Sequence, residues 1–117
     1  MADALDESPP LRFDIRRKGP ATIVSVTGEI DIDTVTDLTD ALAEPLSETD
    51  RLVVDLTEVG FIDSIGLRGL VDIHIQATGA GRRLRLVVGQ GATRRPIEIS
   101  GLNQVLSVHE TVDDALA

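Results

Sequence analysis

Residues 52–70 have the sequence LVVDLTEVGFIDSIGLRGL, which joins an almost unbroken apolar run to the start of an amphipathic helix. Only Asp55 interrupts the run Leu52–Leu56, a pattern typical of a strand buried on both faces of a parallel sheet. After the turn at Gly60, Asp63-Ser64 supplies helix-capping residues, and apolar residues recur at helical spacing as far as Thr78. The predicted apolar stripe of this helix consists of Leu67, Leu70, Val71 and Ile75. We therefore predict a central strand followed by a helix over residues 64–78.

The residues before this stretch predict a hairpin and a first helix. Apolar and polar residues alternate over residues 11–16, and the breaker Lys18-Gly19-Pro20 separates them from a β-branched segment at 21–27. From Thr34 onward, Asp33 or Thr34 is expected to cap a helix that Pro45 ends. Its apolar stripe comprises Val35, Leu38, Leu42 and Leu46.

The residues after it continue the alternation of strands and helices. Strands are expected at 84–88 and 105–108, and helices at 92–100 and 110–117. This order predicts an α/β fold with a mixed, mostly parallel sheet of four or five strands and about four helices. Residues 1–10 mix acids with Pro9-Pro10 and are expected to form a flexible arm ahead of one domain at 11–117.

Composition narrows the possible functions. The 117 residues hold 20 Asp and Glu against 11 Lys and Arg, a net charge of −9, and no cysteine. The negative charge opposes the phosphate backbone, so direct binding to nucleic acid is not expected. No apolar run reaches the roughly 18–20 residues of a membrane span, and the N-terminus lacks a secretion signal. We expect a cytoplasmic protein that does not bind a membrane.

Three candidate ligand sites fail on their residue patterns. Gly89–Arg94 resembles a dinucleotide loop but has Arg94 in place of the third glycine, so a tight turn is the better interpretation. Asp31, Asp33 and Asp37 lack the glycine and the bidentate acid of a calcium loop. His74 has no cysteine or nearby serine to activate. Neither a metal nor a cofactor is therefore expected; the arginines at 82, 83, 85, 94 and 95 remain weak anion-site candidates.

Two glycines in the helix after Asp63 need an explanation. Gly66 and Gly69 together give up about 1–2 kcal/mol relative to alanine. Either the helix packs closely on the sheet, or another protein approaches bare backbone at Gly66, and these alternatives are evenly matched. Ser64 is expected to be an ordinary N-cap in either case.

Two motifs resemble those of the STAS domain family, specifically single-domain bacterial anti-sigma-factor antagonists. Gly28-Glu29-Ile30-Asp31 is similar to the family's G-E-[LI]-D, and Asp63-Ser64-Ile65-Gly66-Leu67 is similar to its D-S-x-G-[LM]. The resemblance extends from about Leu11 to Ala117 and includes Ile97–Leu102, which is similar to E-[LI]-[ST]-G-[LI]. The sequence departs from the family at Ile65, where many members have a small residue, and at Pro96, where a helix former is usual.

The resemblance implies a partner-switching regulator of transcription without enzymatic activity. Such a protein binds an anti-sigma factor of the serine/threonine-kinase type and thereby frees a sigma factor. The kinase then phosphorylates the motif serine, here Ser64, and a phosphatase resets it. The positions that map to the partner-facing surface are Asp31, Asp63, Ser64, Ile65, Gly66 and Leu67.

Electrostatics supports such a switch at Ser64. A phosphate adds a charge of about −1.5 to −2, which the start of a helix tolerates but a docked partner would have to bury beside Asp63. Two alternatives stay open. One is a STAS-like ligand or nucleotide sensor, or an accessory module of a transport or signalling complex, with the same helix start as an anion site. The other is a hydrolase with Ser64 as nucleophile, although the G-x-S-x-G elbow is missing.

Overall fold

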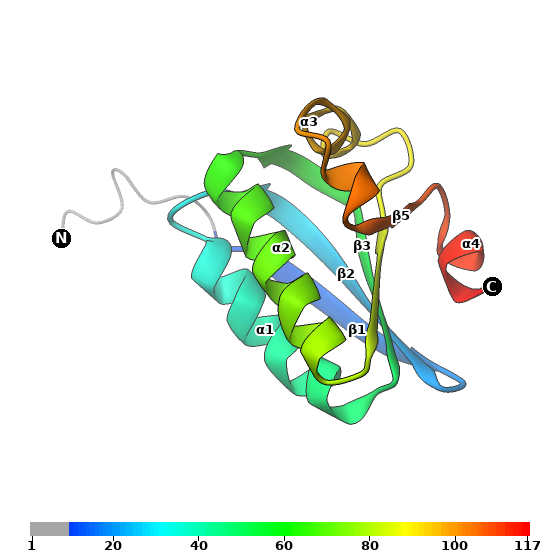
Figure 1. Cartoon of the computed structure of the whole chain (residues 1–117). Coiled ribbons are helices and arrows are strands. Elements are labelled where there is room, and N and C mark those ends of the chain that lie inside the picture. Colours follow the sequence, from blue (N-terminus) through cyan, green and yellow to red (C-terminus); the bar gives the residue numbers. More distant parts are fainter. Residues whose placement is uncertain (1–9) are drawn as a thin grey trace, which may run out of the picture.

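A computed structural model describes residues 10–117 as a single five-stranded sheet flanked by helices (Figure 1). The strands lie in chain order, and only the first pair is antiparallel. The elements are β1 (Arg12–Lys18), β2 (Ala21–Ile30), α1 (Val35–Glu48), β3 (Arg51–Ile62), α2 (Ser64–Gly79), β4 (Arg83–Val87), α3 (Arg94–Ile99), a short 3-10 helix η2 (Leu102–Gln104), β5 (Ser107–His109) and α4 (Val112–Leu116). This architecture confirms the predicted α/β class with a mixed, mostly parallel sheet.

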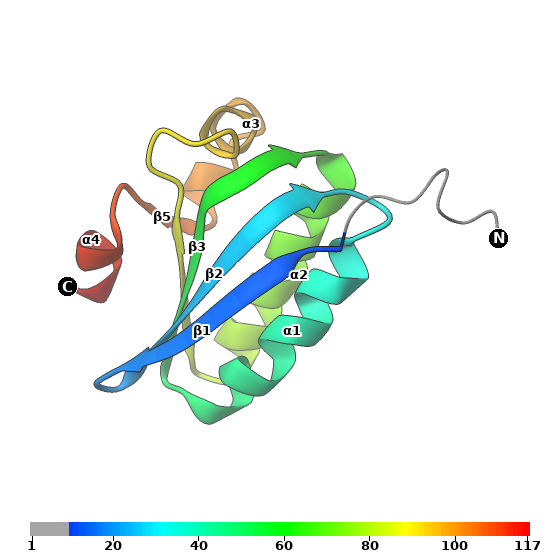
Figure 2. The ribbon, with the colours of Figure 1, turned by 180° about the vertical axis from the view of Figure 1, so that it is seen from behind.

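The middle strand is β3, as the apolar run at 52–56 predicted. Its residues Leu52, Val53 and Val54 are fully buried, because helices cover both faces of the sheet. On one face α1 and α2 lie side by side (Figures 1 and 2), and on the other α4 packs through Ala115 onto Val53. Ala115 shares that smaller core with Ile23 and Val87.

The strand β3 is longer than predicted because it continues through Thr57 to Ile62. This second half pairs in parallel with the end of β2, across register irregularities between Ser25 and Thr27 and between Gly28 and Glu29. β4 pairs only with residues 51–55 of β3. The second half of β3 therefore extends beyond the end of β4 and pairs only with β2. The two strands therefore end together, at Ile30 and Ile62.

Two details of the predicted helices are wrong. Pro45 does not end α1 but is buried within its last turn, where the missing N–H removes a single hydrogen bond and the helix continues to Glu48. Ile75 does not belong to the buried stripe of α2, since its exposed fraction is 60%. The buried positions are Gly66, Gly69, Leu70, Ile73 and Ala77. Small residues mark this line because the helix lies close to its neighbours, a feature that a search for large apolar side chains misses.

Two expectations concern the ends of the chain and the membrane. The arm predicted at residues 1–10 lies outside the described residues except for Pro10. Among the helices of residues 10–117, none combines the length and the apolar character needed to cross a bilayer.

Candidate functional site

The parallel pair β2 and β3 brings both sequence motifs to one edge of the sheet. Ile30 and Ile62 are paired residues at the ends of the two strands, so Asp31 and Asp63 follow at neighbouring positions. The Asp63 N–H donates to the Ile30 carbonyl at 3.2 Å, which ties the second motif to the first. Segments that are more than thirty residues apart in sequence thus form one surface at the carboxyl ends of the central strands.

Asp63, and not Ser64, is the N-cap of α2. Its carboxylate accepts a hydrogen bond from the Gly66 N–H at 2.9 Å, and its extended backbone lies outside the helix. Ser64 is the first helical residue, so the prediction that it caps the helix is wrong. Its side chain is exposed, and within residues 10–117 its hydroxyl forms no hydrogen bond. An accessible serine hydroxyl therefore stands at the positive end of the α2 dipole.

Asp31 holds the turn that leads into α1. Its carboxylate accepts hydrogen bonds from the N–H groups of Asp33 at 2.9 Å and Thr34 at 3.2 Å. The Thr34 hydroxyl donates to the Glu29 carbonyl at 2.7 Å, so it closes the turn without capping the helix. Thr34 is the N-cap residue, one of the two positions expected, but its side chain forms no capping hydrogen bond, and the Asp31 carboxylate instead holds the turn just before the helix.

Close packing explains the two buried glycines of α2, Gly66 and Gly69. A β-carbon at Gly66 would lie 2.7 Å from Ile30 Cγ2 and 2.9 Å from the Ile30 carbonyl oxygen. At Gly69 it would lie 2.5 Å from Val35 Cγ2 of α1. Gly66 is buried and Leu67 packs partly against the core. These two predicted site residues therefore hold the start of α2 against the sheet and are not part of the exposed surface. Asp31 and Asp63 are half-buried, whereas Ser64 and Ile65 are exposed.

Apolar side chains that the sequence analysis did not single out lie at the same end of the sheet. Ile32 follows Asp31 in the turn and is 69% exposed, and Phe61 near the end of β3 is 48% exposed. Ile65 adds a third exposed apolar side chain, at 42%. The sequence contains one indication that Ile32 is exposed, its position between two aspartates in a turn, because a residue there cannot pack into the core.

The surface is also strongly acidic. Residues 29–37 and 58–68 together contain a single cation, Arg68. Their carboxylates belong to Glu29, Asp31, Asp33, Asp37, Glu58 and Asp63. Exposed apolar side chains amid carboxylates suit a protein partner better than an anion.

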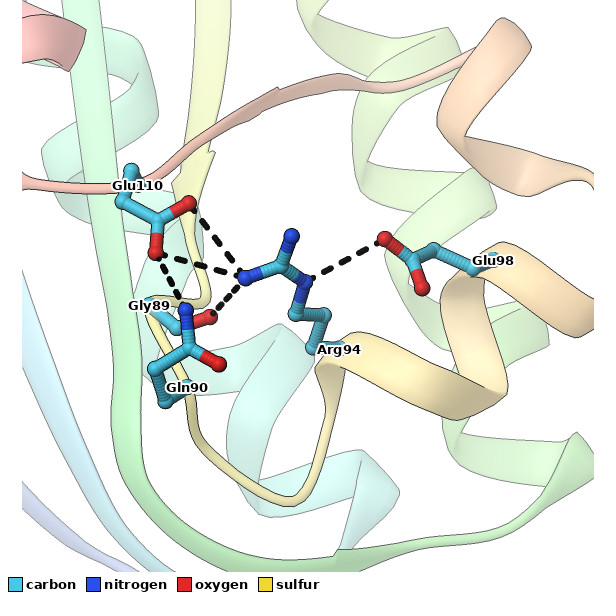
Figure 3. A network of polar contacts seen from close by, with 5 residues as sticks. All are labelled: Gly89, Gln90, Arg94, Glu98 and Glu110. Carbon is cyan, nitrogen blue, oxygen red and sulfur yellow. Dashed lines mark hydrogen bonds and ion pairs between the residues drawn. The ribbon is translucent and has the colours of Figure 1, made fainter.

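The loop at Gly89–Arg94 is a tight turn, as predicted, and its arginine is already paired (Figure 3). The Arg94 guanidinium reaches Glu98 at 3.2 Å and Glu110 at 3.3 Å, and it also donates to the Gly89 carbonyl. Arg94, Glu98 and Glu110 line a cleft of about 230 Å³. Arg94 therefore does not offer a free positive charge to a phosphate.

Two of the remaining arginines have structural partners, whereas Arg83 and Arg95 are exposed and their side chains form no hydrogen bond or ion pair within residues 10–117. Arg82 donates to the Thr49 carbonyl at 2.7 Å, and Arg85 donates to the Ala115 carbonyl at 2.9 Å. Burial lowers the pKa of Arg85, as do the nearby charges of Arg51 and Arg83. His74 is half-buried on α2. Over the described part of the chain, no group of three or more His, Asp or Glu residues could hold a metal ion.

Comparison with known proteins agrees with this geometry. The STAS domain family matches residues 12–115. The anti-sigma-F factor antagonist RsfB of Mycobacterium tuberculosis is 34% identical over 95 residues, which cover 80% of this chain and 77% of RsfB. The crystal structure of an anti-sigma factor antagonist from Mycobacterium paratuberculosis has a TM-score of 0.83 and 33% identity, covering 91% of each chain.

The same fold occurs in the more distant anti-sigma factor antagonist SpoIIAA. Its unphosphorylated form has a TM-score of 0.70 at 16% identity, covering 90% of this chain and 93% of SpoIIAA. Its phosphorylated form has a TM-score of 0.65 at 16% identity, covering 90% and 96%. The chain belongs to the STAS domain family, among the anti-sigma factor antagonists. Members of this class are regulators without enzymatic activity, which confirms the prediction that the protein is not an enzyme.

Proposed function

We propose that this protein binds an anti-sigma factor of the serine/threonine-kinase type through the surface around Ser64, and that phosphorylation of Ser64 abolishes the binding. The observation that carries the proposal is the exposed, unbonded hydroxyl of Ser64 at the first position of α2. The contact residues are Asp31, Asp63, Ser64 and Ile65, supported from below by Gly66 and Leu67. The similarity to RsfB and to SpoIIAA, which is known in a phosphorylated form, supports this assignment.

The chemistry of the surface specifies the partner. Six carboxylates on two short segments favour a partner face rich in Lys and Arg. The exposed side chains of Ile32, Phe61 and Ile65 call for an apolar contact within that basic face. The cation-rich face would steer the two proteins together, and the apolar contact would hold them.

A phosphate on Ser64 would act on the interface more than on the fold. The helix dipole stabilises negative charge at the N-terminus of α2. The Ser64 side chain also forms no hydrogen bond within residues 10–117 that phosphorylation would break. The phosphate would instead lie next to the exposed side chain of Ile65 and close to the Asp63 carboxylate, so a docked partner would have to bury a dianion at its apolar contact, away from its cations. An unpaired buried charge costs several kcal/mol, which corresponds to a loss of affinity of about a hundredfold or more. A phosphatase that removes the phosphate would restore binding.

A small-ligand sensor is the second candidate, because the cleft of about 230 Å³ beside α3 is large enough for a small molecule. Its arginine is neutralised by Glu98 and Glu110 (Figure 3), so an anionic nucleotide would find no free cation there. Phe, Tyr and Trp side chains for base stacking are also missing from its lining, in which His109 supplies the single ring. These features favour the antagonist over the sensor.

Titration calorimetry against the anti-sigma factor from the source cell tests the proposal. We expect affinity to follow the order Ala ≥ Ser > Asp > phosphoserine at position 64, since Ser64→Asp supplies only part of the charge of a phosphate. Equal affinity of Ser64→Asp and wild type, together with an unmodified Ser64 after incubation with kinase and ATP, would refute the switch. Micromolar binding of ATP or GTP without response to the anti-sigma factor would favour the sensor.

A further inference from the structure

Ser64 begins a row of exposed residues along α2. Arg68 and Asp72 follow at intervals of four residues, so the three side chains lie on one face of the helix. Arg68 Nε lies 3.8 Å from Asp72 Oδ1, and the two side chains are 79% and 52% exposed. This separation is longer than a hydrogen bond, and an exposed pair of this kind holds its members weakly. Arg68 can therefore leave Asp72 at little cost.

A phosphate on Ser64 would find few other cations. Arg68 is the single Lys or Arg in the two acidic segments at 29–37 and 58–68. It lies one helical turn from Ser64, where β-carbons are about 5–6 Å apart and a long side chain reaches its neighbour. A guanidinium can donate two parallel hydrogen bonds to the oxygens of a phosphate or of a carboxylate such as that of Asp72. The phosphate carries about twice the negative charge of the carboxylate, so it attracts Arg68 more strongly.

We infer that Arg68 is the counter-ion of the Ser64 phosphate and exchanges Asp72 for the phosphate when Ser64 is modified. This inference rests on the proposed phosphorylation site and adds the residue that receives its charge. Arg68 is a positioning residue, since it holds the phosphate against α2 and favours its fully ionised form. The acidic surface thereby accommodates a further dianion without unfolding the helix start. The single charge of Arg68 does not neutralise the phosphate, so a docked partner would still have to bury unpaired negative charge.

Phosphorus NMR on the protein with phosphoserine installed at position 64 during translation tests the inference. The chemical shift of the phosphate, followed against pH at low salt, reports its second ionisation, whose ordinary pKa is about 6. We expect Arg68→Gln to raise this pKa by roughly 0.2–0.4 units, the shift equivalent to an exposed i,i+4 ion pair. Arg68→Lys, which keeps the charge, should recover most of the wild-type value.

Lys18→Gln is the matched control, because it removes the same charge from the hairpin end of β1. We expect no shift in this variant. Equal pKa values in wild type and Arg68→Gln would overturn the inference, as would an equal rise in Lys18→Gln. Because the phosphoserine is introduced without a kinase, the result is independent of whether the kinase modifies Ser64, which is the test of the proposed function.

Discussion

Gly66 of α2 lies against Ile30 at the end of β2, so closely that a β-carbon at position 66 would be 2.7 Å from Ile30 Cγ2. Ile62 Cγ1 would lie at the same distance, and the Ile30 carbonyl oxygen at 2.9 Å. The start of α2 thus packs directly on the ends of the two strands that precede Asp31 and Asp63. A requirement of the fold, rather than the approach of a partner, explains why this position has no side chain.

Gly66→Ala should destabilise the domain. The added methyl group must displace two isoleucine side chains and meets backbone, so we expect the free energy of unfolding to fall by about 1–3 kcal/mol. Urea unfolding followed by circular dichroism measures the change. Such a loss would support the first of the two alternatives that the sequence left open for Gly66, close packing of the helix on the sheet.

Gly79→Ala is the control for Gly66→Ala on the same helix. A β-carbon at Gly79 would have no atom within 4 Å among the described residues outside its own helix neighbourhood. We expect it to be neutral or to stabilise the domain by up to about 1 kcal/mol. If both variants are equally stable, the packing explanation of Gly66 is wrong.

Substitutions at Asp63 and Ser64 should separate the helix cap from the exposed hydroxyl. Asp63→Ala removes the acceptor of the Gly66 N–H and should lower the free energy of unfolding by about 0.5–2 kcal/mol, whereas Asp63→Asn keeps an acceptor and most of the stability. Ser64→Ala removes no hydrogen bond within residues 10–117 and should change stability by less than about 0.5 kcal/mol. Chemical unfolding of the three variants checks this order, and a larger loss for Ser64→Ala than for Asp63→Ala would contradict it.

Val54→Asp should abolish folding. Val54 is fully buried in the middle strand, where a carboxylate would lack water and a partner. We expect no cooperative thermal transition in circular dichroism. Val105→Asp makes the same change at a position that is 54% exposed and should melt like wild type. A cooperative melt of Val54→Asp at the wild-type temperature would refute the placement of β3.

His109 should make the domain less stable in mild acid. Burial lowers the pKa of His109 below its ordinary value of 6.5, Arg85 lowers it further, and Asp114 acts in the opposite direction. The unfolded chain then binds more protons than the folded one, so the free energy of unfolding falls as the pH drops below 6.5.

Chemical unfolding of wild type and His109→Gln over a pH series tests this contribution. The loss of stability below pH 6.5 should be steeper in wild type, and the difference between the two proteins should stay constant above about pH 7.5, where the imidazole is neutral in both states. Parallel pH profiles throughout would show that His109 does not contribute.

Secondary structure that depends on the local pattern of apolar residues was predicted from the sequence. Packing between residues that are far apart in the sequence was not. The strand at 52–56 and the helix at 64–78 follow from apolar periodicity alone, and both are present. The reason for Gly66 was undecided because it depends on Ile30, which lies more than thirty residues away. Ile75 was misplaced because periodicity favours large apolar residues, whereas the contact face of α2 is built around glycine and alanine.

The candidate site shows the same division. Asp31 and Asp63 were predicted through the motifs, and the pairing of Ile30 with Ile62 gives the physical reason for their proximity. Ile32 and Phe61 were missed because exposure of an apolar residue depends on which elements leave it uncovered.

The pairing of Ile30 with Ile62 also fixes the shape of the surface on which Asp31 and Ser64 lie. Two neighbouring parallel strands fix the distance between the turn at Asp31 and the start of α2. The helix also packs directly on those strands at Gly66, so it cannot shift towards them. The proposed partner would thus meet a preorganised surface, and little of the binding free energy would be lost in ordering loops. The proposed phosphate on Ser64 would therefore change the charge of this surface and not its shape, and only a protein in contact with the surface would respond to it.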